Sequence, residues 1–82
     1  AASISIYPNP VRGNSVTVKT NFRPGEQFYF LVYDMAGNQI ISREETENSF
    51  TFFTCDLNSS GTFILNLVNE NQCFTNKLIV LP

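Results

Sequence analysis

The amino-acid sequence predicts an all-β fold built as a sandwich of two sheets. Seven short segments are rich in β-branched and aromatic residues, and clusters of Gly, Pro, Asn, Ser or Asp separate them. No segment carries apolar residues at helical spacing over three turns, so helix is predicted to be essentially absent. With 82 residues, 43% of them apolar, the chain is expected to form one domain over residues 1–82. Short strands at this spacing fit a sandwich better than a closed barrel.

The predicted strands follow one another at short intervals. In chain order they are residues 3–7, 15–20, 27–34, 39–43, 49–56, 62–69 and 73–81. The first ends at Pro8-Asn9-Pro10, where two residues with fixed φ and no N–H cannot pair in a central strand, so the chain must turn. The second alternates apolar and polar residues, which places Val16 and Val18 on an inner face.

The third strand is apolar on both faces and is predicted to be central, with Phe28, Phe30 and Val32 on the core side. Its connection to the fourth strand has the composition of a tight hairpin. Gly37 can adopt a positive φ there, and the carboxylate of Asp34 can accept backbone N–H bonds. A calcium site at this loop is the weaker interpretation, because the alternating acidic spacing of an EF-hand is missing.

The last strands are assigned by their alternation. The sixth is predicted to turn one face to the core, with Phe63, Leu65 and Leu67. A two-residue loop at Glu70-Asn71 would pair Leu67 with Phe74 and Val68 with Cys73. In that register the seventh strand turns three residues to the core, Phe74, Leu78 and Val80.

The two cysteines have no CxxC spacing and no His beside them, which excludes the common zinc sites and leaves a disulfide or two free thiols. Alternation in the fifth strand groups Cys55 with Phe53 and Leu57, which we expect in the core. Cys73 points away from the core in the predicted register. A disulfide needs converging Cβ vectors, so free thiols are the favoured interpretation.

The composition argues against several classes of function. The net charge is −2, from five Lys and Arg and seven Asp and Glu, and no segment is basic, so nucleic acid and anionic membranes are not predicted partners. No apolar run approaches the ~20 residues that span a bilayer. The chain has no His, and Glu44, Glu45 and Glu47 are expected in one solvated loop, so an enzyme, a cofactor and a metal are not predicted.

Three tyrosines leave a binding function open. Tyr7, Tyr29 and Tyr33 can line a groove for a sugar or a peptide, although core packing with a hydrogen-bonded hydroxyl is the favoured interpretation. An adhesive or carbohydrate-binding module of immunoglobulin type, at the end of a surface protein, is therefore kept as an alternative. Exposed aromatic residues in one groove would favour it.

Four motifs stand out by their order along the chain: Tyr7-Pro8-Asn9-Pro10, Val32-Tyr33-Asp34-Met35-Ala36-Gly37-Asn38, Gly61-Thr62-Phe63 and Lys77-Leu78-Ile79-Val80. Together they resemble the type A C-terminal sorting domain of the type IX secretion system of Bacteroidota. The likeness covers nearly the whole chain, and the order and spacing of the motifs make it specific. The resemblance implies a seven-stranded immunoglobulin-like β-sandwich.

The resemblance also implies a function. Such domains end large secreted or surface proteins, and they are read in the periplasm by the outer-membrane translocon and its shuttle protein. A cell-surface sortase usually removes the domain, and the cargo stays at the outer membrane and cell surface or is secreted. The domain would then be a signal and not an enzyme, even where its cargo is an enzyme such as a protease.

Two motifs carry specific hypotheses within that function. We expect the final strand to be the recognition element, through Lys77, Leu78, Ile79, Val80 and Leu81, because a terminal strand can offer unpaired N–H and C=O groups to a receptor strand. Unpaired edge strands also make a strand-exchanged or edge-paired dimer plausible. Pro8-Asn9-Pro10 is either a simple turn or a rigid entry that fixes where the cargo linker ends and the folded signal begins.

Overall fold

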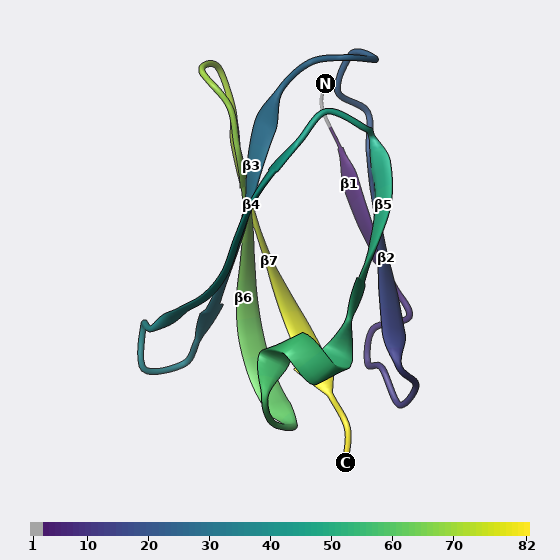
Figure 1. Ribbon diagram of the computed structural model, residues 1–82, viewed down its shortest axis with the longest axis vertical. Coiled ribbons are helices and arrows are strands. Elements are labelled where there is room, and N and C mark those ends of the chain that lie inside the picture. The colour runs from purple at the N-terminus through teal and green to yellow at the C-terminus, as the bar shows by residue number, and fades with distance from the viewer. Residues whose placement is uncertain (1–2) are drawn as a thin grey trace.

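The computed structural model describes residues 3–82, which form two antiparallel sheets packed face to face (Figure 1). Three strands form one sheet in the order β1-β2-β5, and four form the other in the order β4-β3-β6-β7. Their bounds are β1 Ile4–Tyr7, β2 Ser15–Thr20, β3 Phe28–Asp34, β4 Gln39–Glu45, β5 Ser49–Phe53, β6 Gly61–Val68 and β7 Cys73–Val80. The predicted seven-stranded immunoglobulin-like sandwich is confirmed.

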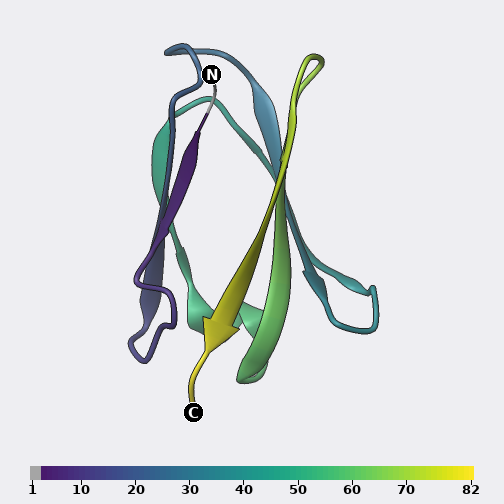
Figure 2. The same ribbon diagram turned by 180° about the vertical axis from the view of Figure 1, so that it is seen from behind.

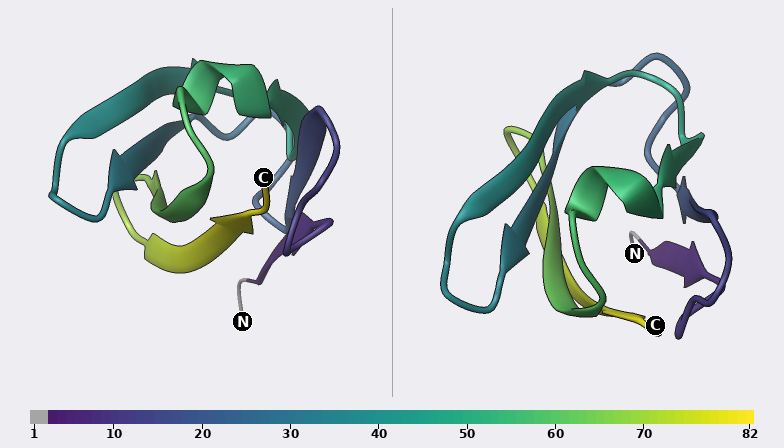
Figure 3. Two further views of the ribbon diagram at one scale, coloured as in Figure 1. Left: turned by 90° about the horizontal axis from the view of Figure 1, so that it is seen from below. Right: turned by 60° about the horizontal axis from the view of Figure 1, so that its bottom comes forward.

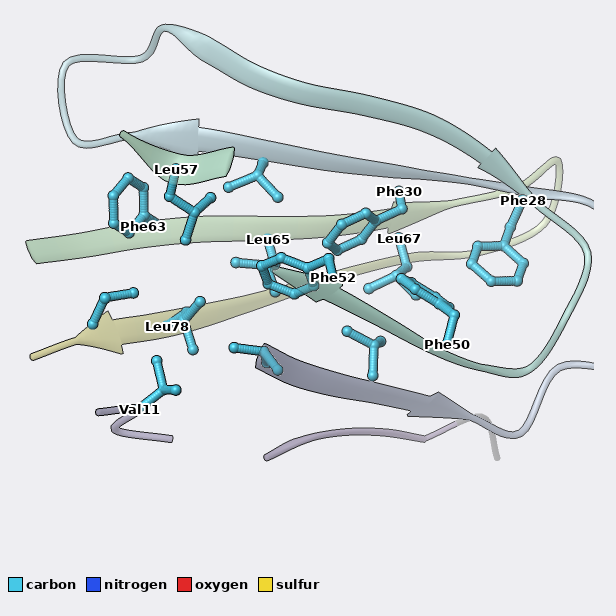
Figure 4. Packing of buried hydrophobic residues seen from close by; sticks show 14 of the residues in the cluster. Val11, Phe28, Phe30, Phe50, Phe52, Leu57, Phe63, Leu65, Leu67 and Leu78 are labelled. Carbon is cyan, nitrogen blue, oxygen red and sulfur yellow. The ribbon is translucent and has the colours of Figure 1, made fainter. Parts of the chain in front are cut away.

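The inner faces of the two sheets form the core, as Figure 4 shows for several labelled side chains. Alternation puts every second residue of each strand inside, and all the core positions predicted for β2, β3 and β6 are buried. Four phenylalanine rings connect the sheets, with centroids 5.0 Å apart for Phe30 and Phe50 and 5.1 Å apart for Phe30 and Phe52.

The hairpin of β6 and β7 has the predicted register. Leu67 lies opposite Phe74 and Val68 lies opposite Cys73, with a two-residue loop between the strands. Leu78 and Val80 are buried and Phe74 packs against the core, so the predicted inner face of the last strand is confirmed.

The fifth predicted strand was too long. β5 ends at Phe53, and a 3-10 helix over Thr54–Leu57, labelled η1, carries the chain across one end of the sandwich toward β6 (Figure 3). The prediction that Phe53 and Cys55 face the core is therefore wrong, because it continued the alternation past the end of the strand. Phe53 is 54% exposed and Cys55 is exposed, whereas Phe50 and Phe52 are buried. Leu57 is buried as predicted, because the helical turn points it back to the core.

The fourth predicted strand was too short. β4 continues to Glu45, so Glu44 and Glu45 belong to a strand, and Glu47 alone lies in the following loop. Within residues 3–82 no helix is long and apolar enough to cross a membrane.

Candidate recognition surface on the last strand

The last strand is an edge strand, and residues 8–11 lie along its outer side. We call residues 8–11 the strap. After β1 ends in the three-stranded sheet, the strap crosses to β7 in the four-stranded sheet, and the chain then returns to begin β2 (Figure 2). Both prolines of the strap follow cis peptide bonds. The chain leaves the β1–β2 pair and changes direction at the Pro-Asn-Pro motif, as the turn interpretation expects. The motif does not mark where folded structure begins, because β1 already pairs with β2 on its N-terminal side.

The side chain of Asn9 pairs with β7 as a peptide group would. Its Nδ2 donates to the carbonyl oxygen of Lys77 at 2.8 Å, and its Oδ1 accepts from the backbone N–H of Ile79 at 3.0 Å. A primary amide carries one acceptor and two donors in a plane, so Asn can bond a strand edge at both kinds of group. Two of the four motifs identified in the sequence therefore touch.

Val11 continues this pairing with its backbone. Its N–H donates to the carbonyl of Ile79 at 2.9 Å, and its carbonyl accepts from the N–H of Leu81 at 2.8 Å, which forms a parallel bridge between Val11 and Val80. The Val11 side chain is fully buried and lies beside Leu78 in the core (Figure 4). Sequence reasoning missed Val11, whose only signal is a single aliphatic residue directly after the motif.

The predicted recognition strand has two different faces. Leu78 and Val80 are anchored in the core, while Lys77 is exposed and Ile79 is 37% exposed on the outer face of the sheet. The expectation that this segment offers unpaired main-chain groups is wrong, because the strap occupies the edge from the carbonyl of Lys77 to the N–H of Leu81. While the strap is in place, the outward side chains are what this segment presents.

A scan against protein-family models matches the family described as "Secretion system C-terminal sorting domain" over residues 5–81. The chain belongs to this family. The resemblance to type IX sorting domains that the sequence predicted is thereby confirmed, and the sorting domain carries its terminal motif on the edge strand described above.

The sandwich of this sorting domain is also similar to part of a solved structure. That structure is of PorZ, described as an essential bacterial surface component of the type-IX secretion system of Porphyromonas gingivalis. The TM-score is 0.79 at 16% sequence identity, and the match covers 96% of this chain and 11% of the PorZ chain. At this identity the likeness shows the fold alone. None of the curated proteins compared with this chain matches it.

The second motif of the sorting domain forms the predicted hairpin loop between β3 and β4. Oδ1 of Asp34 accepts from the backbone N–H groups of Ala36 at 3.0 Å and Asn38 at 2.8 Å, and Oδ2 accepts from Nδ2 of Asn38 at 3.0 Å. These hydrogen bonds hold the pKa of Asp34 below its ordinary value, and the bond from the side chain of Asn38 lowers it most. Gly37 has a φ of 90°, as the turn requires.

The remaining motif residues have structural positions. The hydroxyl of Tyr33 donates to Oε1 of Gln39 across the β3–β4 pair at 3.4 Å, and Gly61 begins β6 with a φ of 129°. These contacts shape the loops at the ends of the sorting domain. Among the described residues no cluster of three or more His, Cys, Asp or Glu side chains can hold a metal ion.

The tyrosines of the sorting domain do not build a shared groove. Tyr7 is 48% exposed on β1 and Tyr29 is 50% exposed on β3, so the expectation of core packing is wrong for both. Tyr33 is half-buried outside the core cluster. Tyr7 lies on the outer face of one sheet, and Tyr29 and Tyr33 lie on the outer face of the other. Tyr29 borders a hollow of about 520 Å³ with Glu26, Val68 and Glu70, which Tyr7 does not reach.

Proposed function

We propose that residues 1–82 act as the C-terminal signal of a larger exported protein and direct that cargo through the type IX outer-membrane translocon. The family assignment supports this proposal. The signal meets the translocon and its shuttle protein in the periplasm, and a sortase at the cell surface then removes it. In this function the domain is bound and cleaved by other proteins and catalyses nothing itself.

The outward side chains of Lys77 and Ile79 carry the recognition in this proposal. This assignment rests on the way the segment around Lys77 and Ile79 is anchored. Leu78 and Val80 are buried in the core, and Asn9 forms hydrogen bonds to the backbone at the outer edge of β7. The backbone that carries the exposed side chains of this segment is therefore held in place before any partner arrives. Preorganised groups bind with less loss of conformational entropy than mobile ones.

A fusion experiment tests the proposal. Residues 1–82 are fused to a periplasmic reporter in a bacterium that has a type IX secretion system, and the reporter is measured at the cell surface and in the medium. We expect the wild-type fusion to be exported, and the Lys77→Ala and Ile79→Asp fusions to remain in the periplasm, because each removes an exposed group from β7.

Matched controls separate recognition from folding. Lys19→Ala and Phe53→Asp change exposed residues on the outer face of the other sheet, and these fusions should be exported normally. Unfolding midpoints of all the purified variants should stay near that of the wild type. Normal export of both β7 variants would contradict the assignment of recognition to these side chains, and a wild-type fusion that stays in the periplasm would contradict the proposed function.

A further inference from the structure

The main-chain groups of β7 alternate between β6 and the outside. The hairpin closes with a hydrogen bond from the N–H of Asn69 to the carbonyl of Gln72, so the even-numbered residues of β7 bond to β6. The odd-numbered residues therefore direct their N–H and C=O groups away from the sheet. Asn9 and Val11 of the strap bond to this same set of groups.

The strap covers only half of this edge. The main-chain groups of Cys73 and Thr75 point outward, and no hydrogen bond within residues 3–82 occupies them. Both residues are exposed. The edge of β7 thus has an open half before Lys77 and a covered half after it. An open strand edge is a template on which another extended chain can pair.

We propose that the edge of β7 is a strand-addition site, and that the strap is the segment displaced when it is used. The inference rests on the proposed function, and the occupant is an extended segment of a protein of the secretion machinery. The incoming strand pairs first with Cys73 and Thr75 and then takes the hydrogen bonds that Asn9 and Val11 make in the free domain. The strap shows that this edge accepts an added strand, since it already forms one bridge with it.

The strap also shows which side chain the incoming strand needs. Val11 is fully buried, while Pro8, Asn9 and Pro10 are exposed. Removing Val11 alone would leave a hole next to Leu78, and unfilled volume in a core is destabilising. A partner segment that replaces the strap must therefore carry an aliphatic residue at the position of Val11. Its other positions face solvent and are less restricted.

A disulfide lock tests the displacement. The variant carries Val11→Cys and Val80→Cys in a background in which Cys55 and Cys73 are replaced by serine, so that it holds a single pair of thiols. Val11 and Val80 are bridge partners, and neighbouring strands lie within the Cα separation of about 4.4–6.8 Å that a disulfide spans. In the reporter fusion we expect the oxidised lock to abolish export, because the strap cannot leave β7.

A second lock controls for cross-linking itself. Its substitutions are Thr17→Cys and Thr51→Cys, in the same serine background. Thr17 on β2 and Thr51 on β5 are paired residues, and their hydroxyl oxygens lie 3.5 Å apart. This disulfide joins β2 to β5 and does not involve β7. This fusion should be exported in the oxidised state. Growth with a thiol reductant should restore export of the strap lock. Equal export of both oxidised locks would overturn the proposal, and so would loss of export in both.

The wild-type fusion distinguishes this inference from the proposed function. If the wild type is exported and the strap lock is exported equally well, only the strand-addition inference fails. Asn9→Ala adds a test in the opposite direction, because it loosens the strap. We expect this variant to exchange the amide hydrogen of Ile79 faster and to keep its export. Loss of export at an unchanged unfolding midpoint would show that Asn9 is itself recognised, and would overturn the proposal.

Discussion

Arg43 and Phe50 meet on the side of the sandwich where the edge strands β4 and β5 face each other: the guanidinium carbon of Arg43 lies 5.4 Å from the centre of the Phe50 ring. The same carbon lies 5.7 Å from the ring centre of Phe30, and Nη2 of Arg43 pairs with Oε1 of Glu45 at 2.8 Å. A charged residue that points inward from an edge strand covers apolar rings and also discourages pairing with other chains.

Arg43→Ala should lower the free energy of unfolding by about 1–2 kcal/mol, because it removes the cation–π contacts and the aliphatic cover over the two rings. Urea unfolding followed by fluorescence or circular dichroism measures the change. Arg12→Ala is the control: Arg12 is exposed, and its replacement should change stability by less than about 0.5 kcal/mol. Equal losses in both variants would show that the ring contacts contribute nothing.

The two adjacent phenylalanines of β5 should respond differently to truncation. Phe52 is fully buried and Phe53 is 54% exposed. Phe52→Ala should lower the free energy of unfolding by about 3–5 kcal/mol or prevent folding, whereas Phe53→Ala should cost less than about 1 kcal/mol. The opposite order in urea unfolding would mean that β5 has the alternation assigned from the sequence and not the one in the structure.

Gly37 should be needed for its conformation and not for its small size. Its φ is 90° and a Cβ atom at this residue would have no neighbour within 4 Å, so Gly37→Ala should cost about 1–2 kcal/mol through the backbone alone. Gly13 offers the matched comparison, since its surroundings are equally open and its φ is not positive. Thermal unfolding should give a lower midpoint for Gly37→Ala and an unchanged or higher one for Gly13→Ala. Equal midpoints would contradict this explanation.

The charge of Asp34 should stabilise the fold in a pH-dependent way. Bonds from Asn38 and neighbouring N–H groups lower the pKa of Asp34 in the folded state, so its stabilisation is complete above the ordinary value of 3.8 and is lost as the pH falls through the lowered folded pKa. The difference in free energy of unfolding between wild type and Asp34→Asn should be largest at neutral pH and shrink below 3.8. A difference that does not vary with pH would contradict the effect.

Both cysteines should react with a thiol reagent in the native protein, because both are free and exposed. Titration without reductant should find two thiols, with the same total before and after denaturation. Finding Cys55 reactive only in denaturant would restore the core position that alternation assigned to it, and finding no thiols would indicate a disulfide.

The strands that follow simple alternation could be predicted from the sequence. Val16 and Val18, or Phe63 and Leu65, are buried because a strand turns every second residue the same way, and this rule needs no knowledge of distant contacts. The rule failed at Cys55 because the strand had already ended in a helical turn of four residues, too short to show a periodicity.

The strap could not be predicted for a different reason. The bonds of Asn9 to Lys77 and Ile79 join residues 68 and 70 positions apart, and no local pattern of residue types encodes such a pair. The sequence predicted a turn at the Pro-Asn-Pro motif and an important strand at the C-terminal motif. No pattern in the sequence indicated that the Pro-Asn-Pro motif lies against the C-terminal strand.

The separation in sequence between Asn9 and β7 also determines when the contacts between them can form. Contacts between residues this far apart are slow to form, because a long loop must close before they are made. They cannot form on a nascent chain until Lys77 and Ile79 have emerged from the ribosome. A chain that stops before Lys77 cannot make the bonds between the strap and β7, so these bonds form only after residues 77–81 have been synthesised.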